Sequence, residues 1–324
     1  MKLTPQQSLL QWYKKNGRHD LPWRRTDDPY PIYLSEIMLQ QTQVKTVLER
    51  FYFPFLQKFP TLDDIARADV DDVLKMWEGL GYYTRARNLH AAARFCNGEL
   101  PTTARELISL PGIGRSTAHA IAAFAYKEPL PIMDANVKRI LHRYFALEAH
   151  DERKLWEYAY TLFDPSHPFE YNQAMMDVGS SVCLRKNPQC LLCPFEQSCQ
   201  GKSTPLHYPT PKTKKTKPIR YRNIIVYQKE KHYALIQRQT RFLSGLWGFH
   251  ESEKQPDFQI KSLGEITQSY SHFTLEAHVY LCEEDIEDEG VEWFNLEEIK
   301  TLSLSRADHK VIEKIVQDQK MSHH

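Results

Sequence analysis

The sequence lacks the features that would insert it into a membrane or send it across one. No apolar run among its 324 residues approaches the roughly 20 residues that a membrane-spanning helix needs. The N-terminal stretch MKLTPQQSLLQWYKK has neither the apolar core nor the small-residue cleavage site of a signal peptide. We therefore expect a cytoplasmic protein with no membrane partner.

An excess of charge of either sign is also missing. Lys and Arg number 42 against 41 Asp and Glu, a formal net charge of +1, so the overall charge does not indicate a nucleic-acid ligand. The charge is unevenly distributed, however. Seven basic residues and no acidic one lie between Lys202 and Arg222, in a stretch rich in Pro and Thr that predicts a linker over residues 202–221. The acidic run EEDIEDE at residues 283–289 is typical of a solvated loop.

Cysteine is scarce and is not spread like a disulfide framework. Two of the six cysteines stand alone, and the other four follow the spacing Cys-x6-Cys-x2-Cys-x5-Cys at Cys183, Cys190, Cys193 and Cys199. In a reducing compartment, four thiolates in one short loop indicate a metal site. A structural zinc ion and a [4Fe-4S] cluster both take four cysteines, so the spacing leaves the metal open.

The hydrophobic period changes along the chain. Up to about Tyr160, apolar residues recur at helical spacing between Pro and Gly breaks, which predicts an all-α domain of short helices over residues 1–201, closed by the cysteine loop 183–199. After the linker, a smaller α+β domain is predicted over residues 222–319. Its strands are expected at 223–227, 233–237 and 274–281, and its helix at 305–319.

The stretch LPGIGRSTA at residues 110–118 joins two helical runs. Gly112 and Gly114 permit positive φ and let backbone N–H groups approach an anion, and the next helix adds a partial positive charge at its N-terminus. The Gly-Lys-Ser/Thr of a P-loop and the βαβ context of a dinucleotide fold are both absent. The pattern favours a helix–hairpin–helix at about 105–126 that contacts a DNA phosphate. A plain turn is the commoner origin of a lone Gly-x-Gly.

Two carboxylates stand at the starts of helical runs. Asp134, in MDANVKR, precedes an amphipathic helix and taken alone is an N-cap. Glu36, in SEIMLQQT, taken alone complements a helix dipole. Each is ordinary by itself, and only their combination with the glycine hairpin and the cysteine loop is unusual.

Five stretches occur in order along the chain: SEIMLQQTQV, WEGLGYYTRARNLH, LPGIGRSTA, MDANVKR and YNQAMMD, with the cysteine loop after them. Through them the first two thirds of the chain resemble the MutY-type adenine DNA glycosylases of the helix–hairpin–helix superfamily. The resemblance implies base excision of adenine, flipped out of double-stranded DNA, where it is mispaired with 8-oxoguanine or guanine. It also implies a [4Fe-4S] cluster in place of zinc. We expect a monomer, associated with the nucleoid through DNA.

The resemblance also implies residue roles. Glu36 would protonate N7 of adenine, and Asp134 would stabilise the oxocarbenium-like sugar electrostatically or through a transient covalent link, with Asn136 orienting Asp134 or a water. Glu36 must then hold a proton near neutral pH, which burial beside apolar neighbours favours. The positions that match the family's adenine pocket are Trp23, Arg24, Leu39 and Gln173.

Two further positions match the family's wedges, which fill the stack that the adenine vacates. They are Gln41 and Tyr82, which without the resemblance would be a solvated helix residue and a core aromatic residue. Arg85 and Arg87 would then contact phosphates.

Two departures from the family pattern stand out. Ala135 replaces a usual Gly, which would perturb the Asp134 loop slightly. Ser116 stands where the related endonuclease III enzymes have the lysine that forms a Schiff base and cleaves the strand. Since serine forms no imine, the sequence predicts a monofunctional glycosylase that leaves an abasic site.

Two alternatives remain open. Ser116 and the extra C-terminal domain argue against a bifunctional pyrimidine glycosylase/AP lyase. The intact Glu36 and Asp134 argue against a non-catalytic, metal-stabilised DNA-binding protein.

The C-terminal third resembles the family's Nudix-like domain more weakly. The stretch GLWGFHESE at residues 245–253 looks like a Nudix core, but no Arg-Glu-x-x-Glu-Glu run follows it before Gly264, so we expect binding and not hydrolysis. The family reads 8-oxoguanine through a Phe-Ser-His loop, which corresponds here to Tyr270, Ser271 and His272. Ser271 would hydrogen-bond the lesion. By itself, Ser-His before a strand predicts only a turn.

Overall fold

The computed structural model describes residues 3–210, 216–240, 242–254, 260–284, 286 and 289–321. Three basic residues of the predicted linker (Lys212, Lys214 and Lys215), three acidic residues of the EEDIEDE run (Asp285, Glu287 and Asp288) and the terminal Ser322, His323 and His324 lie outside the described residues. The chain forms two compact units, residues 1–66 with 91–213, and residues 67–90 with 214–324. Residues 67–90, which the sequence places in the helical domain, therefore group with the C-terminal third.

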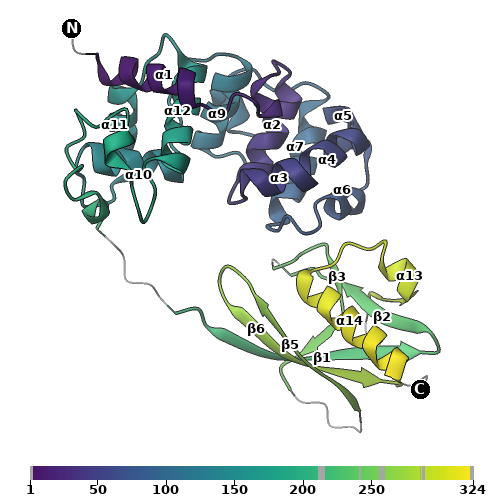
Figure 1. The fold of residues 1–324 in the computed structure, drawn as a ribbon. Helices are drawn as coiled ribbons and strands as arrows, with labels where there is room; N and C mark the ends of the chain where they lie inside the picture. Colours follow the sequence, from purple (N-terminus) through teal and green to yellow (C-terminus); the bar gives the residue numbers. More distant parts are fainter. Residues whose placement is uncertain are drawn as a thin grey trace. The chain divides into compact units, whose positions relative to one another are not determined.

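Short α-helices occupy most of residues 3–210 (Figure 1), as the sequence predicts. In chain order they are α1 (Pro5–Asn16), α2 (Pro29–Leu39), α3 (Val44–Arg50), α4 (Tyr52–Lys58), α5 (Leu62–Arg67), α6 (Val70–Met76), α7 (Thr84–Cys96), α8 (Ala104–Leu107), α9 (Arg115–Ala125), α10 (Ala135–Tyr144), α11 (Glu152–Leu162) and α12 (Pro168–Ser181). A 3₁₀ turn, η1 (Pro22–Arg24), precedes α2.

Local sequence sets where these helices begin. The Thr4 side chain caps α1 in a capping box with Gln7, and Asp28 caps α2 just before Pro29 at the first helical position. Asp134 caps α10. Caps and prolines therefore explain why the helices are many and short.

Buried residues on each helix determine how the helices of the first unit pack. Residues 118–124 of α9 are all buried, and α9 packs on α2, most of whose residues are also buried. A second cluster joins α1, α10, α11 and α12 around Leu9, Val137, Leu155 and Val178. Together these contacts bring the N-termini of α9 and α10 close to α2 and α12.

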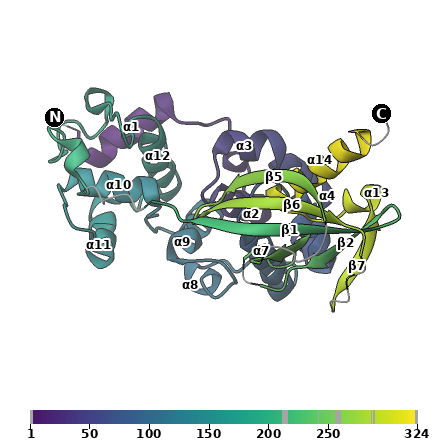
Figure 2. The same ribbon diagram turned by 90° about the horizontal axis from the view of Figure 1, so that it is seen from below.

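The second unit contains a mixed β-sheet. Its strands are β1 (Ile219–Lys229), β2 (His232–Gln237), β3 (Trp247–Gly248), β4 (His250–Ser252), β5 (Lys261–Ser269), β6 (Thr274–Cys282) and β7 (Val291–Asn295). The main order is β3-β2-β1-β6-β5, with β4 beside β1 and β7 beside β2. Strand β1 runs parallel to β6, and β5 forms an antiparallel hairpin with β6; Figure 2 shows these three strands side by side.

Two helices complete this unit, α13 (Leu296–Ile299) and α14 (Arg306–Met321), and α14 packs on β5. Apolar residues of the sheet and of α14, such as Val226, Val279 and Val311, form its core. The α+β character and the strands and helix predicted from sequence are confirmed. The sequence did not predict β3, β4, β5, β7 or α13.

Of the helices that the structure describes, none is both long and apolar enough to span a membrane.

Candidate active site

One pocket of about 430 Å³ in the first unit gathers most of the predicted site. Five helices (α2, α3, α9, α10 and α12) and η1 contribute to it. Eight of the sequence-predicted residues line it: Trp23, Arg24, Glu36, Leu39, Ser116, Asp134, Asn136 and Gln173. These residues are up to 150 positions apart in the chain (173 − 23), so the pocket is a product of helix packing.

Glu36 lies in the last turn of α2 and lines this pocket, so the prediction that it stands at the start of a helix is wrong. The residue is partly exposed to solvent, although protein closely surrounds its carboxyl. Burial raises the pKa of this carboxyl to about 7, the nearby Asp134 raises it further, and the Arg24 charge opposes the rise. About half of Glu36 is therefore protonated at neutral pH.

Asp134 is held in a different environment at the N-terminus of α10. Its Oδ1 accepts from the Val137 amide at 2.7 Å, and its Oδ2 accepts from Asn136 Nδ2 at 3.2 Å. Burial raises the pKa of Asp134, while these hydrogen bonds and the Arg139 charge act in the opposite direction. The two carboxyls share one pocket, but only Asp134 accepts hydrogen bonds that favour its charged form.

The Ala135 departure is accommodated by this geometry. Ala135 is the first residue of α10 and its side chain is exposed. A helical position does not require glycine, so alanine leaves the cap on Asp134 in place.

Arg24 is fixed by a partner that sequence reasoning missed. Its guanidinium donates to both carboxylate oxygens of Asp177, at 2.8 and 2.9 Å, and the two side chains are 3% and 1% exposed. Burial alone would raise the pKa of Asp177, but the hydrogen bond and charge of Arg24 hold it below its usual value. The only sequence signal for Asp177 was its place in the YNQAMMD stretch.

Two further pocket residues have distinct surroundings. Trp23 is buried and meets the Tyr52 ring edge-on at 5.0 Å. The buried Oε1 of Gln173 has no hydrogen-bond partner among the described residues. An unpaired amide oxygen in a cavity costs free energy unless a ligand donates to it.

The glycine hairpin is exposed and leaves the start of α9 free of a side-chain cap. Gly112 has φ +77°, in the left-handed region that glycine favours, and Gly114 is the N-cap of α9. A helix N-terminus of this kind is suited to bind a phosphate. Ser116, in the first turn, instead faces the pocket, where its Oγ accepts from the Met133 amide at 3.1 Å.

The predicted wedge residues are both exposed. Gln41 follows the end of α2 and lies outside any helix, with φ +57°, whereas Tyr82 has φ +52° and is 43% exposed. The interpretations of Gln41 as a helix residue and of Tyr82 as a core aromatic residue are therefore wrong. Strained backbone at exposed non-glycine residues is a feature of functional sites. Gln41 belongs to the first unit and Tyr82 to the second.

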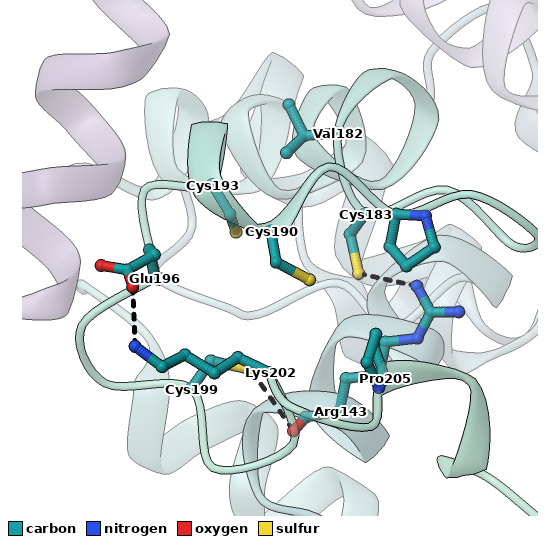
Figure 3. Close-up of a pocket in the computed structure, with 10 residues that line it drawn as sticks. Arg143, Val182, Cys183, Cys190, Cys193, Glu196, Cys199, Lys202 and Pro205 are labelled. Atoms are coloured by element: carbon teal, nitrogen blue, oxygen red, sulfur yellow. Dashed lines mark hydrogen bonds and ion pairs between the residues drawn. The ribbon is translucent and has the colours of Figure 1, made fainter.

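The four loop cysteines line one small cavity of about 20 Å³. Figure 3 shows their side chains around it. Arg143 donates to Cys183 Sγ at 3.3 Å, and its carbonyl accepts from Cys199 Sγ at 3.5 Å. Among the described residues, no three His, Cys, Asp or Glu side chains come together closely enough to hold a single metal ion. Burial raises the pKa of the Cys193 thiol to about 12 and that of Cys199 to about 11.

In the second unit, Ser271 and His272 form an exposed turn between β5 and β6. The turn is closed by the Tyr270 amide, which donates to the Phe273 carbonyl at 2.8 Å. The Tyr270 ring lies 5.0 Å from both Phe242 and Phe273, and burial raises the pKa of its hydroxyl to about 12, with an opposing hydrogen bond to Ser305. Tyrosine therefore fits the position where the family has phenylalanine.

Comparisons with known proteins match both units. Residues 34–165 match the model of the HhH-GPD superfamily base excision DNA repair proteins, and residues 223–314 match that of the NUDIX domain. The chain is 34% identical to the adenine DNA glycosylase of Buchnera aphidicola subsp. Baizongia pistaciae, over 95% of this chain and 96% of that protein. The chain belongs to the adenine DNA glycosylase family.

Two other proteins are similar to about three fifths of this chain. The human adenine DNA glycosylase is 42% identical over 60% of this chain and 39% of the human protein. The solved structure of a thermostable thymine-DNA glycosylase matches with a TM-score of 0.57 and 28% identity, over 61% of this chain and 94% of that chain. The resemblance carried by the five sequence stretches is confirmed.

Proposed function

We propose that the protein is a monofunctional adenine DNA glycosylase of base excision repair. Its substrate is double-stranded DNA in which adenine is mispaired with 8-oxoguanine or guanine, and its product is an abasic site. The observation that carries the proposal is the pair of carboxyls in one pocket, of which Glu36 has a pKa of about 7 and Asp134 accepts stabilising hydrogen bonds.

The pocket has the properties that adenine requires. The flipped base leaves the stack at a cost of roughly a few kcal/mol. Trp23 and Leu39 offer apolar contact, and the unpaired Oε1 of Gln173 can accept from the exocyclic amine. The exocyclic amine would then donate to Gln173 Oε1, which is buried and has no partner among the described residues.

The two carboxyls then divide the chemistry. Protonated Glu36 donates to N7 of adenine, which makes the base a better leaving group as the bond to C1′ breaks. Ionised Asp134 stabilises the positive charge that develops on the sugar, electrostatically or through a transient covalent link, with Asn136 orienting it. The oxygen of a water molecule then bonds to C1′, and the proton that this water loses goes to the Glu36 carboxylate.

Strand cleavage is not expected. A lyase needs an amine that forms an imine with C1′. Ser116 cannot supply one, and no lysine is found among the described residues that line the pocket.

We propose that Cys183, Cys190, Cys193 and Cys199 hold a [4Fe-4S] cluster. Four thiols line one shared space, as zinc or a cluster would require, and the resemblance to the adenine DNA glycosylases favours a cluster over zinc. When bound, the cluster would cross-link the loop and order it beside α10. A broad visible absorbance band that bleaches on reduction tests for iron–sulfur, and a colourless zinc-containing protein would contradict it.

The exposed Ser271 and His272 are proposed to recognise 8-oxoguanine in the opposite strand. The basic linker is proposed to contact DNA phosphates, so the affinity of the protein for DNA should fall as the salt concentration rises. A monomeric state and a cytoplasmic, nucleoid-associated location remain predictions.

One assay separates the proposed function from its alternatives. The protein is incubated with a duplex that carries adenine opposite 8-oxoguanine, and strand cleavage is compared with and without alkali. Cleavage only after alkali supports the proposal. Cleavage without alkali would indicate a lyase, and none in either case a binding protein. The Glu36→Gln variant, prepared identically, controls for contaminating glycosylases.

A further inference from the structure

The four residues that precede Asp134 form an unusual connection between α9 and α10. Residues 130–133 have no regular secondary structure, yet residues 131–133 are buried. Buried backbone N–H and C=O groups must find partners, and a segment outside helices and sheets has few backbone partners to offer. The hydrogen bonds of this segment are therefore informative about what holds Asp134.

Three side chains supply those hydrogen bonds. Asn172 donates to the Leu130 carbonyl at 2.8 Å and accepts from the Ile132 amide at 2.9 Å. His119 Nδ1 donates to the Pro131 carbonyl at 2.8 Å, and Ser116 Oγ accepts from the Met133 amide at 3.1 Å. Together these bonds reach all four consecutive residues 130–133.

These side chains come from two packed helices and are themselves held. Asn172, on α12, is 1% exposed and also donates to the Pro168 carbonyl at 2.8 Å. His119, on α9, packs edge-on against Trp156 at 5.1 Å, and the Arg115 guanidinium covers Trp156 at 3.9 Å. Burial lowers the pKa of His119, so its neutral ring is the donor to Pro131.

We propose that Ser116, His119 and Asn172 are positioning residues that place the Asp134 carboxylate for catalysis by clamping residues 130–133. This inference rests on the proposed function and deepens it. On the C-terminal side of Asp134, the Val137 amide of α10 donates to its carboxylate. On the N-terminal side, the clamp formed by Ser116, His119 and Asn172 holds the backbone that leads into Asp134. A misplacement of about 1 Å can reduce a rate roughly a hundredfold.

His119 is the sharpest place to test the clamp. Ser116 lines the pocket and would also touch a bound base, whereas His119 and Asn172 do not line it. A substitution of His119 therefore changes no side chain that lines the pocket. His119→Phe removes the donor and keeps a ring against Trp156, while His119→Asn keeps an N–H at the place of Nδ1.

The experiment measures two quantities for the full-length protein. The first is the single-turnover rate constant of adenine release from a duplex with adenine opposite 8-oxoguanine. The second is the Kd for the same duplex with a non-cleavable 2′-fluoroadenosine. We expect His119→Phe to lower the rate constant about ten- to a hundredfold with the Kd within about twofold, and His119→Asn to restore most of the rate. The control Ser181→Ala, which loses a hydroxyl bond to the Asp177 carbonyl within α12, should match the unaltered protein.

Several outcomes would overturn the proposal. One is an unchanged rate constant for His119→Phe in a preparation with an unchanged melting temperature. Another is an equal loss of rate for His119→Phe and His119→Asn, which would indicate a packing role only. If His119→Phe fails to fold, Asn172→Asp decides in the same assay, because it keeps the acceptor for the Ile132 amide and loses the donor to the Leu130 carbonyl. A slower rate at unchanged Kd is expected, and an unchanged rate would overturn the clamp. No adenine release by the unaltered protein would instead overturn the proposed function, and the clamp with it.

Discussion

At the scale of single residues, the site depends on how two carboxyls in one pocket come to differ. Glu36 is enclosed by protein, and only the Arg24 charge opposes the rise in its pKa. Asp134 is enclosed as well, but it accepts from Val137 and Asn136. Divergent environments of this kind assign one carboxyl as acid and the other as anion.

The rate of adenine release should therefore depend on the proton of Glu36. Between the pKa of Asp134, below which that carboxylate is protonated, and the Glu36 pKa of about 7, the single-turnover rate constant should be constant. Above pH 7 it should fall about tenfold per pH unit. Glu36→Gln should abolish measurable release while duplex binding persists. A rate constant that rises through pH 7 would contradict the assignment of Glu36 as the acid.

The same raised pKa carries a stability cost. The pKa of Glu36 is higher in the folded protein than its ordinary value of 4.5, so between pH 4.5 and 7 the carboxyl ionises first in the unfolded state, which is thereby stabilised relative to the folded state. The cost is absent below pH 4.5 and complete above pH 7. We expect the free energy of unfolding of Glu36→Gln, relative to the unaltered protein, to rise by about 2 kcal/mol between pH 5 and pH 8.

Urea unfolding of both proteins at the two pH values measures this change. Because all other ionisable groups are shared, the difference between the two proteins isolates Glu36. A difference that does not change with pH would show that the Glu36 pKa is not raised in the folded state.

At the scale of elements, two glycines at helix boundaries have opposite surroundings. A Cβ at Gly114, the N-cap of α9, would meet no heavy atom within 4 Å, and its φ of −88° suits any residue. A Cβ at Gly179 of α12 would lie 2.5 Å from the Asn136 Cβ of α10. Gly179 therefore allows the close packing of α12 on α10. At Gly114, none of the described residues lies where a Cβ would be, so packing does not require a glycine there.

The two alanine variants should accordingly fail in different ways. Gly179→Ala should cost about 1–3 kcal/mol of stability and displace Asn136 from Asp134, slowing base release. Gly114→Ala should change stability by less than about 1 kcal/mol but weaken DNA binding, because the added methyl group obstructs the approach of a phosphate. Melting temperatures and duplex Kd values check both, and unchanged DNA affinity of Gly114→Ala would count against the hairpin as a phosphate contact.

At the scale of the whole molecule, the pocket lies entirely within the first unit and the exposed Ser-His turn within the second. The proposed removal of the base and the proposed recognition of the opposite base can thus be altered separately. The exposed side chains of Ser271 and His272 can be truncated without disturbing the sheet.

The double variant Ser271→Ala/His272→Ala tests this separation. Its rate constant for adenine opposite guanine should be unchanged, while the advantage of 8-oxoguanine as the opposite base should fall about tenfold, since lost hydrogen bonds of this kind are worth roughly 1 kcal/mol or more. Rate constants for the two duplexes measure the ratio. Unchanged discrimination would contradict a reading role for the turn.

Much of this protein was determined by sequence alone, because the signals are local. Caps, prolines and apolar spacing predicted the short helices, and alternation predicted three strands and the last helix. The motifs also named the pocket residues, since each motif keeps its functional side chain at a fixed place. Strands β3 and β4 were missed because they are two and three residues long and leave no periodicity to detect.

Only the tertiary structure decided what each side chain does with its neighbours. The raised pKa of Glu36 needs the burial that packed helices provide, and the Arg24–Asp177 pair joins residues 153 positions apart. The role of Ser116 changed most: as a sequence position it excluded an imine, and in the fold its hydroxyl holds the Met133 amide beside Asp134. Burial and long-range hydrogen bonds depend on packing between distant segments, and spacing along the chain does not encode them.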